Sequence, residues 1–133
     1  MYHVVLGVDE DEEHARAAAK EVTNLPGDGS ETEVTIVHVF QDNPSGASAT
    51  QVASVREAQG VLEDAGITVD VTESSGDPAD AIIEVSEEAD ADLIVVGGRK
   101  RSPAGKALFG SVTQTVILNG GRPVMVTGVV DNE

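Results

Sequence analysis

The chain has 133 residues, of which 24 are acidic, 8 are basic and none is cysteine, and its formal net charge at pH 7 is −16. This charge disfavours nucleic acids and anionic membranes as partners, and the lack of cysteine excludes disulfides and thiolate chemistry. With no apolar run of membrane-spanning length and no secretory signal, we expect a single cytoplasmic domain over residues 1–133.

The acidity has two interpretations. It keeps a protein soluble in any medium, and it also suits a protein that works in molar salt. There the Debye length falls to about 3 Å, so that like charges on the surface no longer repel one another strongly. Because three lysines stand against 24 acidic residues, we favour halophilic adaptation.

The first half of the chain alternates between strand and helix patterns. Residues 2–8 (YHVVLGV) form a nearly continuous apolar run, which is typical of a strand buried on both faces. Apolar residues then recur at helical spacing over 15–25, before a Pro-Gly pair. Residues 33–40 (EVTIVHVF) predict a second strand, and 41–50 predict a polar loop.

The same alternation continues in the middle of the chain. From Val52 to Ala65 the apolar spacing is again helical, and it stops at Gly66. Residues 67–73 (ITVDVTE) alternate apolar and polar, which indicates a strand with one wet face near a sheet edge. A third helix is expected to begin at Pro78 with Asp77 as its cap. Its expected buried residues are Ile82, Val85 and Ala89.

The last third of the chain predicts two more strands and a helix. Residues 92–97 (DLIVVG) indicate a fully buried strand, and 123–130 (PVMVTGVV) a final one. Between them, Ser111 and Gln114 have the spacing of a capping box, with Ser111 as the N-cap. This fourth helix is expected to end near Gly120.

This order of elements predicts the fold class. Strands that alternate with helices form a parallel sheet with helices on both faces. For five strands the doubly wound order is 3-2-1-4-5 or 2-1-3-4-5, and hydrophobic periodicity does not choose between them. In either order, ligands bind at the carboxyl ends of the strands, where the winding reverses.

Three familiar phosphate-binding patterns do not fit the sequence. The GKA at 105–107 lacks the hydroxyl residue and the spacing of a P-loop, and no G-x-G-x-x-G follows the first strand. The acidic residues 9–12 resemble the metal pocket of a phospho-receiver domain. A receiver also needs an aspartate after the third strand, where Glu73 stands, and a lysine after the fifth, where there is none. The acidic residues also suit the positive end of the first helix.

The sequence contains no catalytic constellation. His3, His14 and His38 are scattered, no G-x-S-x-G elbow is present, and no cluster of ligands has transition-metal spacing. A lone strand histidine is more often a hydrogen-bonded structural residue than a base. We therefore assign no catalytic and no metal-binding residues.

The stretch GGRKRSPAGKALFGS at 97–111 holds four of the eight basic residues together with four glycines. It connects a buried strand to a helix N-terminus. Glycines allow the backbone to approach a ligand closely, and the free N–H groups of a helix start bind anions. The alternative is a solvated basic loop whose glycines only form turns.

This stretch resembles the ATP-binding signature of the universal stress protein family, G-x2-G-x9-G-[ST]. Gly97 matches its first glycine, Arg99 falls where the family often has Arg or His, and Gly110 and Ser111 match its end. The resemblance extends over the whole chain, including VLGVDEDEEHARAAAKEV, VTIVHVF, SSGDPADAIIEVSEEADADLIVVGG and GRPVMVT. One position departs, because Lys100 replaces the second glycine. Lys100 either crowds the phosphates or replaces a backbone contact with its charge.

The resemblance implies the strand order 3-2-1-4-5 and a set of ligand contacts. In that order Asp9, after the first strand, faces Gly97, after the fourth. Asp9 would contact the nucleoside and the backbone of Val39 the adenine. The phosphates would bind the amides of Gly110, Ser111 and Val112, and could carry Mg²⁺ or Mn²⁺.

The family resemblance leaves three functions open. The first is a stress regulator that binds ATP or another adenine nucleotide without efficient catalysis. The second is a dimeric interaction protein that no longer binds nucleotide, and the third is a slow ATPase. A homodimer through residues 123–130 is expected, because this long apolar edge strand has little protective charge.

Overall fold

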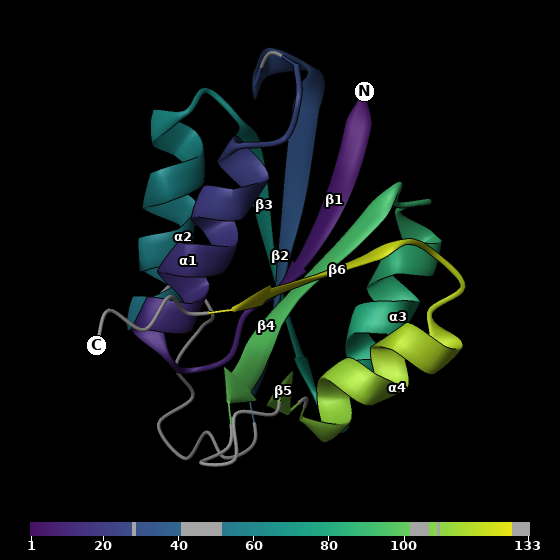
Figure 1. Cartoon of the computed structure of the whole chain (residues 1–133). Helices are drawn as coiled ribbons and strands as arrows, with labels where there is room; N and C mark the ends of the chain where they lie inside the picture. The colour runs from purple at the N-terminus through teal and green to yellow at the C-terminus, as the bar shows by residue number, and fades with distance from the viewer. Residues whose placement is uncertain (28, 41–51, 102–106, 109, 129–133) are drawn as a thin grey trace.

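The computed structural model describes residues 1–27, 29–40, 52–101, 107–108 and 110–128, with backbone only at 40, 98–101 and 107–108. The loop expected at 41–50 lies outside these residues. Figure 1 shows one twisted sheet with a pair of helices on each side. Within the described residues, no helix is long and apolar enough to span a membrane.

Five parallel strands form the sheet, in the order β3-β2-β1-β4-β6. Their bounds are Tyr2–Gly7 (β1), Thr32–Phe40 (β2), Thr68–Ser75 (β3), Leu93–Arg101 (β4) and Val124–Gly128 (β6). Counted along the chain as five parallel strands, this is the order 3-2-1-4-5. The wet-faced third strand is an edge of the sheet, and none of its residues is fully buried.

The fourth strand is longer than expected. The basic stretch was expected to be a loop from residue 97 onward, but β4 continues to Arg101. An irregularity between Val96 and Arg99 shifts the register, so that Arg99 pairs with Gly128 of β6. Lys100 and Arg101 then pair with the short antiparallel strand β5, Ala107–Leu108. Strand pairing therefore fixes the backbone of the first residues of the basic stretch.

Two helices cover each face of the sheet. On one face α1 (Glu12–Thr23) and α2 (Ala53–Asp64) pack on alternate residues of the central strands, such as Leu6 and Ile36. On the other, α3 (Pro78–Glu88) and α4 (Ser111–Asn119) pack on residues such as Val5 and Val37. A short 3₁₀ helix, η1 (Gly29–Glu31), precedes β2.

The helix starts confirm one expected cap and contradict another. Asp77 caps α3 by accepting hydrogen bonds from the amides of Ala79 at 2.9 Å and Asp80 at 3.2 Å. The expected cap at Ser111 is wrong, because Gly110 is the N-cap and Ser111 is the first helical residue. Gly110 has extended backbone angles, and its carbonyl accepts the amide of Gln114 at 3.1 Å.

The interior of α3 also differs from the expectation. Ile82 is buried as expected, but Val85 and Ala89 are only partly buried. Ser86 is fully buried, and its hydroxyl donates to the carbonyl of Ile83 at 2.7 Å. Because this bond satisfies the hydroxyl within the helix, a polar residue occupies a core position that hydrophobic spacing could not identify.

Candidate functional site

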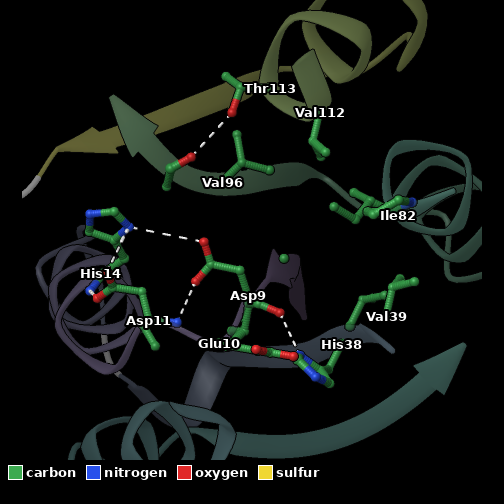
Figure 2. A pocket seen from close by; sticks show the side chains of 16 residues that line it. Asp9, Glu10, Asp11, His14, His38, Val39, Ile82, Val96, Val112 and Thr113 are labelled. Atoms are coloured by element: carbon green, nitrogen blue, oxygen red, sulfur yellow. Dashed lines mark hydrogen bonds and ion pairs between the residues drawn. The ribbon is translucent and has the colours of Figure 1, made fainter. Parts of the chain in front are cut away.

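A cavity of about 720 Å³ opens at the carboxyl ends of β1 and β4. These strands are neighbours in the sheet, and the chain winds away from them in opposite directions, which is the usual ligand position in this fold class. Figure 2 shows the cavity between the acidic segment after β1 and the start of α4. Its lining residues are Gly7, Val8, Asp9, Glu10, Asp11, His14, Ala15, Val37, His38, Val39, Pro78, Ile82, Val96, Gly97, Val112 and Thr113.

Side-chain and backbone bonds hold the acidic segment after β1 in place. One carboxylate oxygen of Asp9 accepts the amide of Asp11 at 2.9 Å, and Asp11 caps α1 by accepting the amide of His14 at 3.0 Å. From α2, the fully buried hydroxyl of Ser54 donates to the carbonyl of Asp9 at 2.5 Å. The position of Asp9 therefore depends on a helix distant in sequence.

His14 lies beside these carboxylates, one turn into α1. Its Nδ1 atom is 4.0 Å from Oδ2 of Asp9 and 3.8 Å from Oδ2 of Asp11. Both distances exceed those of a hydrogen bond. Nδ1 is buried, and within the described part of the chain no group accepts or donates a hydrogen bond to it. Figure 2 shows Asp9 and Asp11 around this ring.

His38 has a structural role at the floor of the cavity. It is almost fully buried in β2, and its Nδ1 donates to the carbonyl of Val8 at 2.8 Å. This bond ties the end of β1 to β2. The next residue, Val39, also lines the cavity.

The other side of the cavity belongs to β4 and α4. The hydroxyl of Thr113 donates to the carbonyl of Gly97 at 3.1 Å, which fixes the end of the buried part of β4 against the helix. Gly110 and Ser111 are exposed at the start of α4, directly before Val112, which lines the cavity. The first amides of this nine-residue helix have no intrahelical acceptor, so they are suited to bind an anion.

Apolar side chains form a wall between these two polar regions. Val39, Pro78, Ile82, Val96 and Val112 line it, and they come from four different elements. Gly7 keeps it open, because a Cβ atom at this position would lie 2.7 Å from Cδ1 of Ile82 and would displace that side chain. A wall of this kind suits a flat, mostly apolar group such as a nucleobase.

Most of the site residues expected from the sequence lie around one cavity. Asp9, Val39, Gly97 and Val112 line it, and Gly110 and Ser111 adjoin it. The backbone of Arg99 and Lys100 lies in β4, but their side chains are outside the described part of the structure.

Sequence reasoning missed several cavity residues and their supports: His14, Ser54, Pro78, Ile82, Val96 and Thr113. Among these residues, only His14 could have been found from the sequence. It follows Asp11 by one helical turn, so it faces the same end of the sheet as Asp11. The described residues contain no group of three or more His, Cys, Asp or Glu that could hold a metal ion.

A model of the universal stress protein family matches residues 1–128 of the chain. The chain belongs to the universal stress protein family. A universal stress protein from Mycolicibacterium smegmatis is 33% identical over 72 residues, which is 53% of this chain and 55% of the relative. The matches to the first curated relatives span about half of their length or less.

Solved structures show the same fold over nearly the whole chain. A universal stress protein in complex with cAMP is 27% identical, with a TM-score of 0.73 over 97% of this chain and 98% of its own. A universal stress family protein from Arabidopsis thaliana with AMP bound is 17% identical, with a TM-score of 0.74 over 100% of this chain and 95% of its own. At that identity the likeness concerns the fold alone.

Proposed function

We propose that this universal stress protein binds ATP or another adenine nucleotide in the cavity between β1 and β4, and acts as a regulator without efficient catalysis. The observation that carries the proposal is the arrangement of that cavity. It combines an apolar wall with an acidic segment on one side and the start of α4 on the other. A base, a ribose and a phosphate chain need these three environments. Relatives of the same fold are described as complexes with cAMP and with AMP.

Each part of the nucleotide has a suitable partner in the cavity. The base would lie on the apolar wall with its edge toward the backbone of Val39. The ribose hydroxyls would donate to Asp9, whose carboxylate is already oriented by the amide of Asp11. The phosphates would bind the amides of Gly110, Ser111 and Val112, and Gly97 would allow their approach. Mg²⁺ or Mn²⁺ would be held through the phosphates.

Titration calorimetry with ATP, AMP and adenosine tests the proposal, together with mass spectrometry of nucleotide retained through purification. We expect ATP to bind wild type, and Asp9→Ala to weaken adenosine as well as ATP because it removes the ribose partner. Glu84→Ala, an exposed acidic residue of α3 outside the cavity lining, is the control. Absence of binding by wild type would refute the proposal in favour of the interaction module.

Two substitutions of Lys100 decide how the departure from the family signature acts. If the ammonium replaces a backbone contact, Lys100→Ala weakens ATP more than adenosine, because adenosine has no phosphate. Charge-assisted contacts of this kind contribute about 1.5–3 kcal/mol each, and less where salt screens them. If Lys100 crowds the phosphates, Lys100→Gly tightens ATP. Tight binding by the glycine variant alone would refute the charge-replacement account.

Hydrolysis is a separate candidate. The cavity residues include His14 and His38, but His38 already donates to the carbonyl of Val8, so it is poorly placed to activate water. We expect phosphate release from ATP to equal that of a matched blank without protein. Release above the blank, abolished in Asp9→Ala, would instead identify a slow ATPase.

A homodimer is favoured by the free edge of β6. Within the described residues this strand pairs only with β4, and Val124, Met125 and Val126 are partly exposed along it. Ile117 and Leu118 of the neighbouring α4 are exposed apolar residues. We propose that a second copy covers β6, the described part of the predicted dimer segment 123–130. Light scattering at micromolar concentration in high salt is expected to give the mass of a dimer, and a monomer would contradict it.

Adaptation to molar salt is part of the same proposal. Screening of a net charge of −16 is expected to raise the melting temperature steeply between roughly 0.1 M and 2 M KCl. An unchanged melting temperature over that range would show that the acidity serves solubility alone.

A further inference from the structure

His14 is a cavity residue with a buried ring nitrogen that makes no hydrogen bond in the described structure. Its side chain is 17% exposed, yet its Nδ1 atom is buried and makes no hydrogen bond there. Carboxylate oxygens of Asp9 and Asp11 lie 4.0 Å and 3.8 Å from this atom. Burying a polar atom without a hydrogen bond costs free energy. An atom of this kind beside a cavity is therefore a candidate to bind a ligand group.

Among the described side chains, the charged groups that contact the His14 ring are carboxylates. Asp9 and Asp11 face it from the segment before α1, and Glu10 lines the same cavity. Of the elements that pack against α1, α2 carries charged side chains at Arg56, Glu63 and Asp64, all of them exposed. Beside Gly97 of β4 lies the neutral Thr127 of β6. On α2, Glu57 is paired with Arg16 at 2.9 Å.

His14 also adjoins the backbone that would receive the phosphates. A Cβ atom on Gly97 would lie 3.9 Å from both the Cβ atom and the carbonyl oxygen of His14. Gly97 is the first glycine of the basic stretch. The Cβ atom and the carbonyl of His14 therefore lie beside the proposed phosphate path, while its ring nitrogen faces the two carboxylates.

We propose that His14 distinguishes phosphorylated adenine ligands from the neutral nucleoside. When the phosphate chain enters, the imidazole takes up one proton from solvent. The resulting cation balances the carboxylates of Asp9 and Asp11 against the phosphates. Histidine suits this role, since its charge changes near neutral pH. This inference rests on the proposed function and assigns a specificity-determining residue to the same cavity.

The expected size of the effect follows from Coulomb's law. Removing one positive charge beside a phosphate at a largely solvated site weakens binding by about fivefold to tenfold. Adenosine has no phosphate, so its affinity is expected to change little. The ratio of ATP affinity to adenosine affinity is therefore the quantity that His14 controls.

Calorimetry at a pH of about 7.5, in two buffers of different ionisation enthalpy, measures how many protons the protein takes up when the ligand binds. We expect wild type to take up more protons on binding ATP than His14→Gln does, and to take up none with adenosine. His14→Gln is expected to weaken ATP by about fivefold to tenfold. His14→Lys, which carries a fixed charge, is expected to restore ATP affinity without restoring proton uptake.

His3→Gln is the matched control, because His3 lies at the opposite end of β1 and outside the cavity. We expect it to keep the wild-type proton uptake and the ratio of ATP to adenosine affinity. Equal proton uptake by wild type and His14→Gln would overturn the inference, as would an equal loss of ATP and adenosine affinity. In both cases nucleotide binding itself would stand. If wild type bound no nucleotide, the proposed function would fail together with the inference.

Discussion

A histidine lies next to carboxylates at each end of the parallel sheet. The two histidines differ in the hydrogen bonding of their ring nitrogens. At the amino end, both ring nitrogens of His3 are engaged, by Glu33 at 3.0 Å and by Thr35 at 2.9 Å. Its backbone amide also donates to Asp92 at 2.9 Å. At the carboxyl end, Nδ1 of His14 makes no hydrogen bond within the described residues.

This difference separates a polar network that stabilises the fold from one that is suited to a ligand. A network in which every member is paired has no capacity left for a further partner. The amino end is also closed by Arg122, whose Nε donates to the carbonyl of Ala91 at 2.8 Å. At the carboxyl end, Asp9, Asp11, the buried Nδ1 of His14 and the first amides of α4 instead lie around a cavity.

Two glycines give the largest expected contrast between the ends. Gly120 lies at the C-cap of α4, where a Cβ atom would be 2.6 Å from the carbonyl oxygen of Val116. We expect Gly120→Ala to lower the free energy of unfolding by about 3 kcal/mol, because backbone cannot easily move aside. At Gly97 an added Cβ meets no atom closer than 3.5 Å, so Gly97→Ala is expected to change stability by less than about 0.5 kcal/mol.

Urea unfolding of both glycine variants, with ATP titration of Gly97→Ala, checks this contrast. We expect the alanine at position 97 to weaken ATP binding, since it occupies space that the phosphates approach. Equal destabilisation by the two substitutions would show that Gly97 serves the fold.

The two histidines give the next contrast. We expect His3→Ala to lower the free energy of unfolding by about 2 kcal/mol, because it removes bonds to Glu33 and Thr35. His14→Ala is expected to cost less than half as much, since Nδ1 of His14 has no hydrogen bond to lose in the described structure. Chemical denaturation of both variants under one set of conditions measures the difference. A larger loss for His14→Ala would mean that the carboxyl end is the more tightly held network.

Two fully buried serines give the smallest contrast. Ser54 donates to the carbonyl of Asp9 at the cavity, whereas Ser86 donates to the carbonyl of Ile83 inside α3. Each alanine variant is expected to lose about 1 kcal/mol of stability through one missing hydrogen bond. Only Ser54→Ala is expected to weaken ATP, by about threefold to fivefold, because Asp9 loses its anchor. Equal ATP affinities in the two variants would exclude a positioning role for Ser54.

The sheet could be predicted because parallel strands that are buried on both faces consist of nearly continuous apolar residues, as at 2–8 and 92–97. Periodicity left two strand orders open, and the family resemblance pointed to the one that forms. The extension of β4 through Arg101 could not be predicted, because its partners in β5 and β6 are set by tertiary pairing. The basic residues Arg99, Lys100 and Arg101 show neither the apolar run nor the alternation that predicts a strand.

The cavity was only partly predictable for a related reason. Asp9 and Gly97 were identified through the family resemblance, whose strand order places both at the point where the winding reverses. Ser54 and Thr113 act through hydroxyl bonds to the carbonyls of those same residues, and no sequence spacing reveals such pairings. His14 was noted only as an isolated histidine, since its position beside two carboxylates depends on the cap at Asp11.

The central claim is that the carboxyl end of the sheet, and not the amino end, binds an adenine nucleotide. Titration of ¹⁵N-labelled protein with ATP, followed by amide chemical shifts, tests it most directly. We expect the amides of Asp9, Val39, Gly97 and Val112 to shift with a common saturation curve, while those of His3 and Asp92 stay in place. Unchanged spectra, or shifts confined to the amino end, would contradict the account.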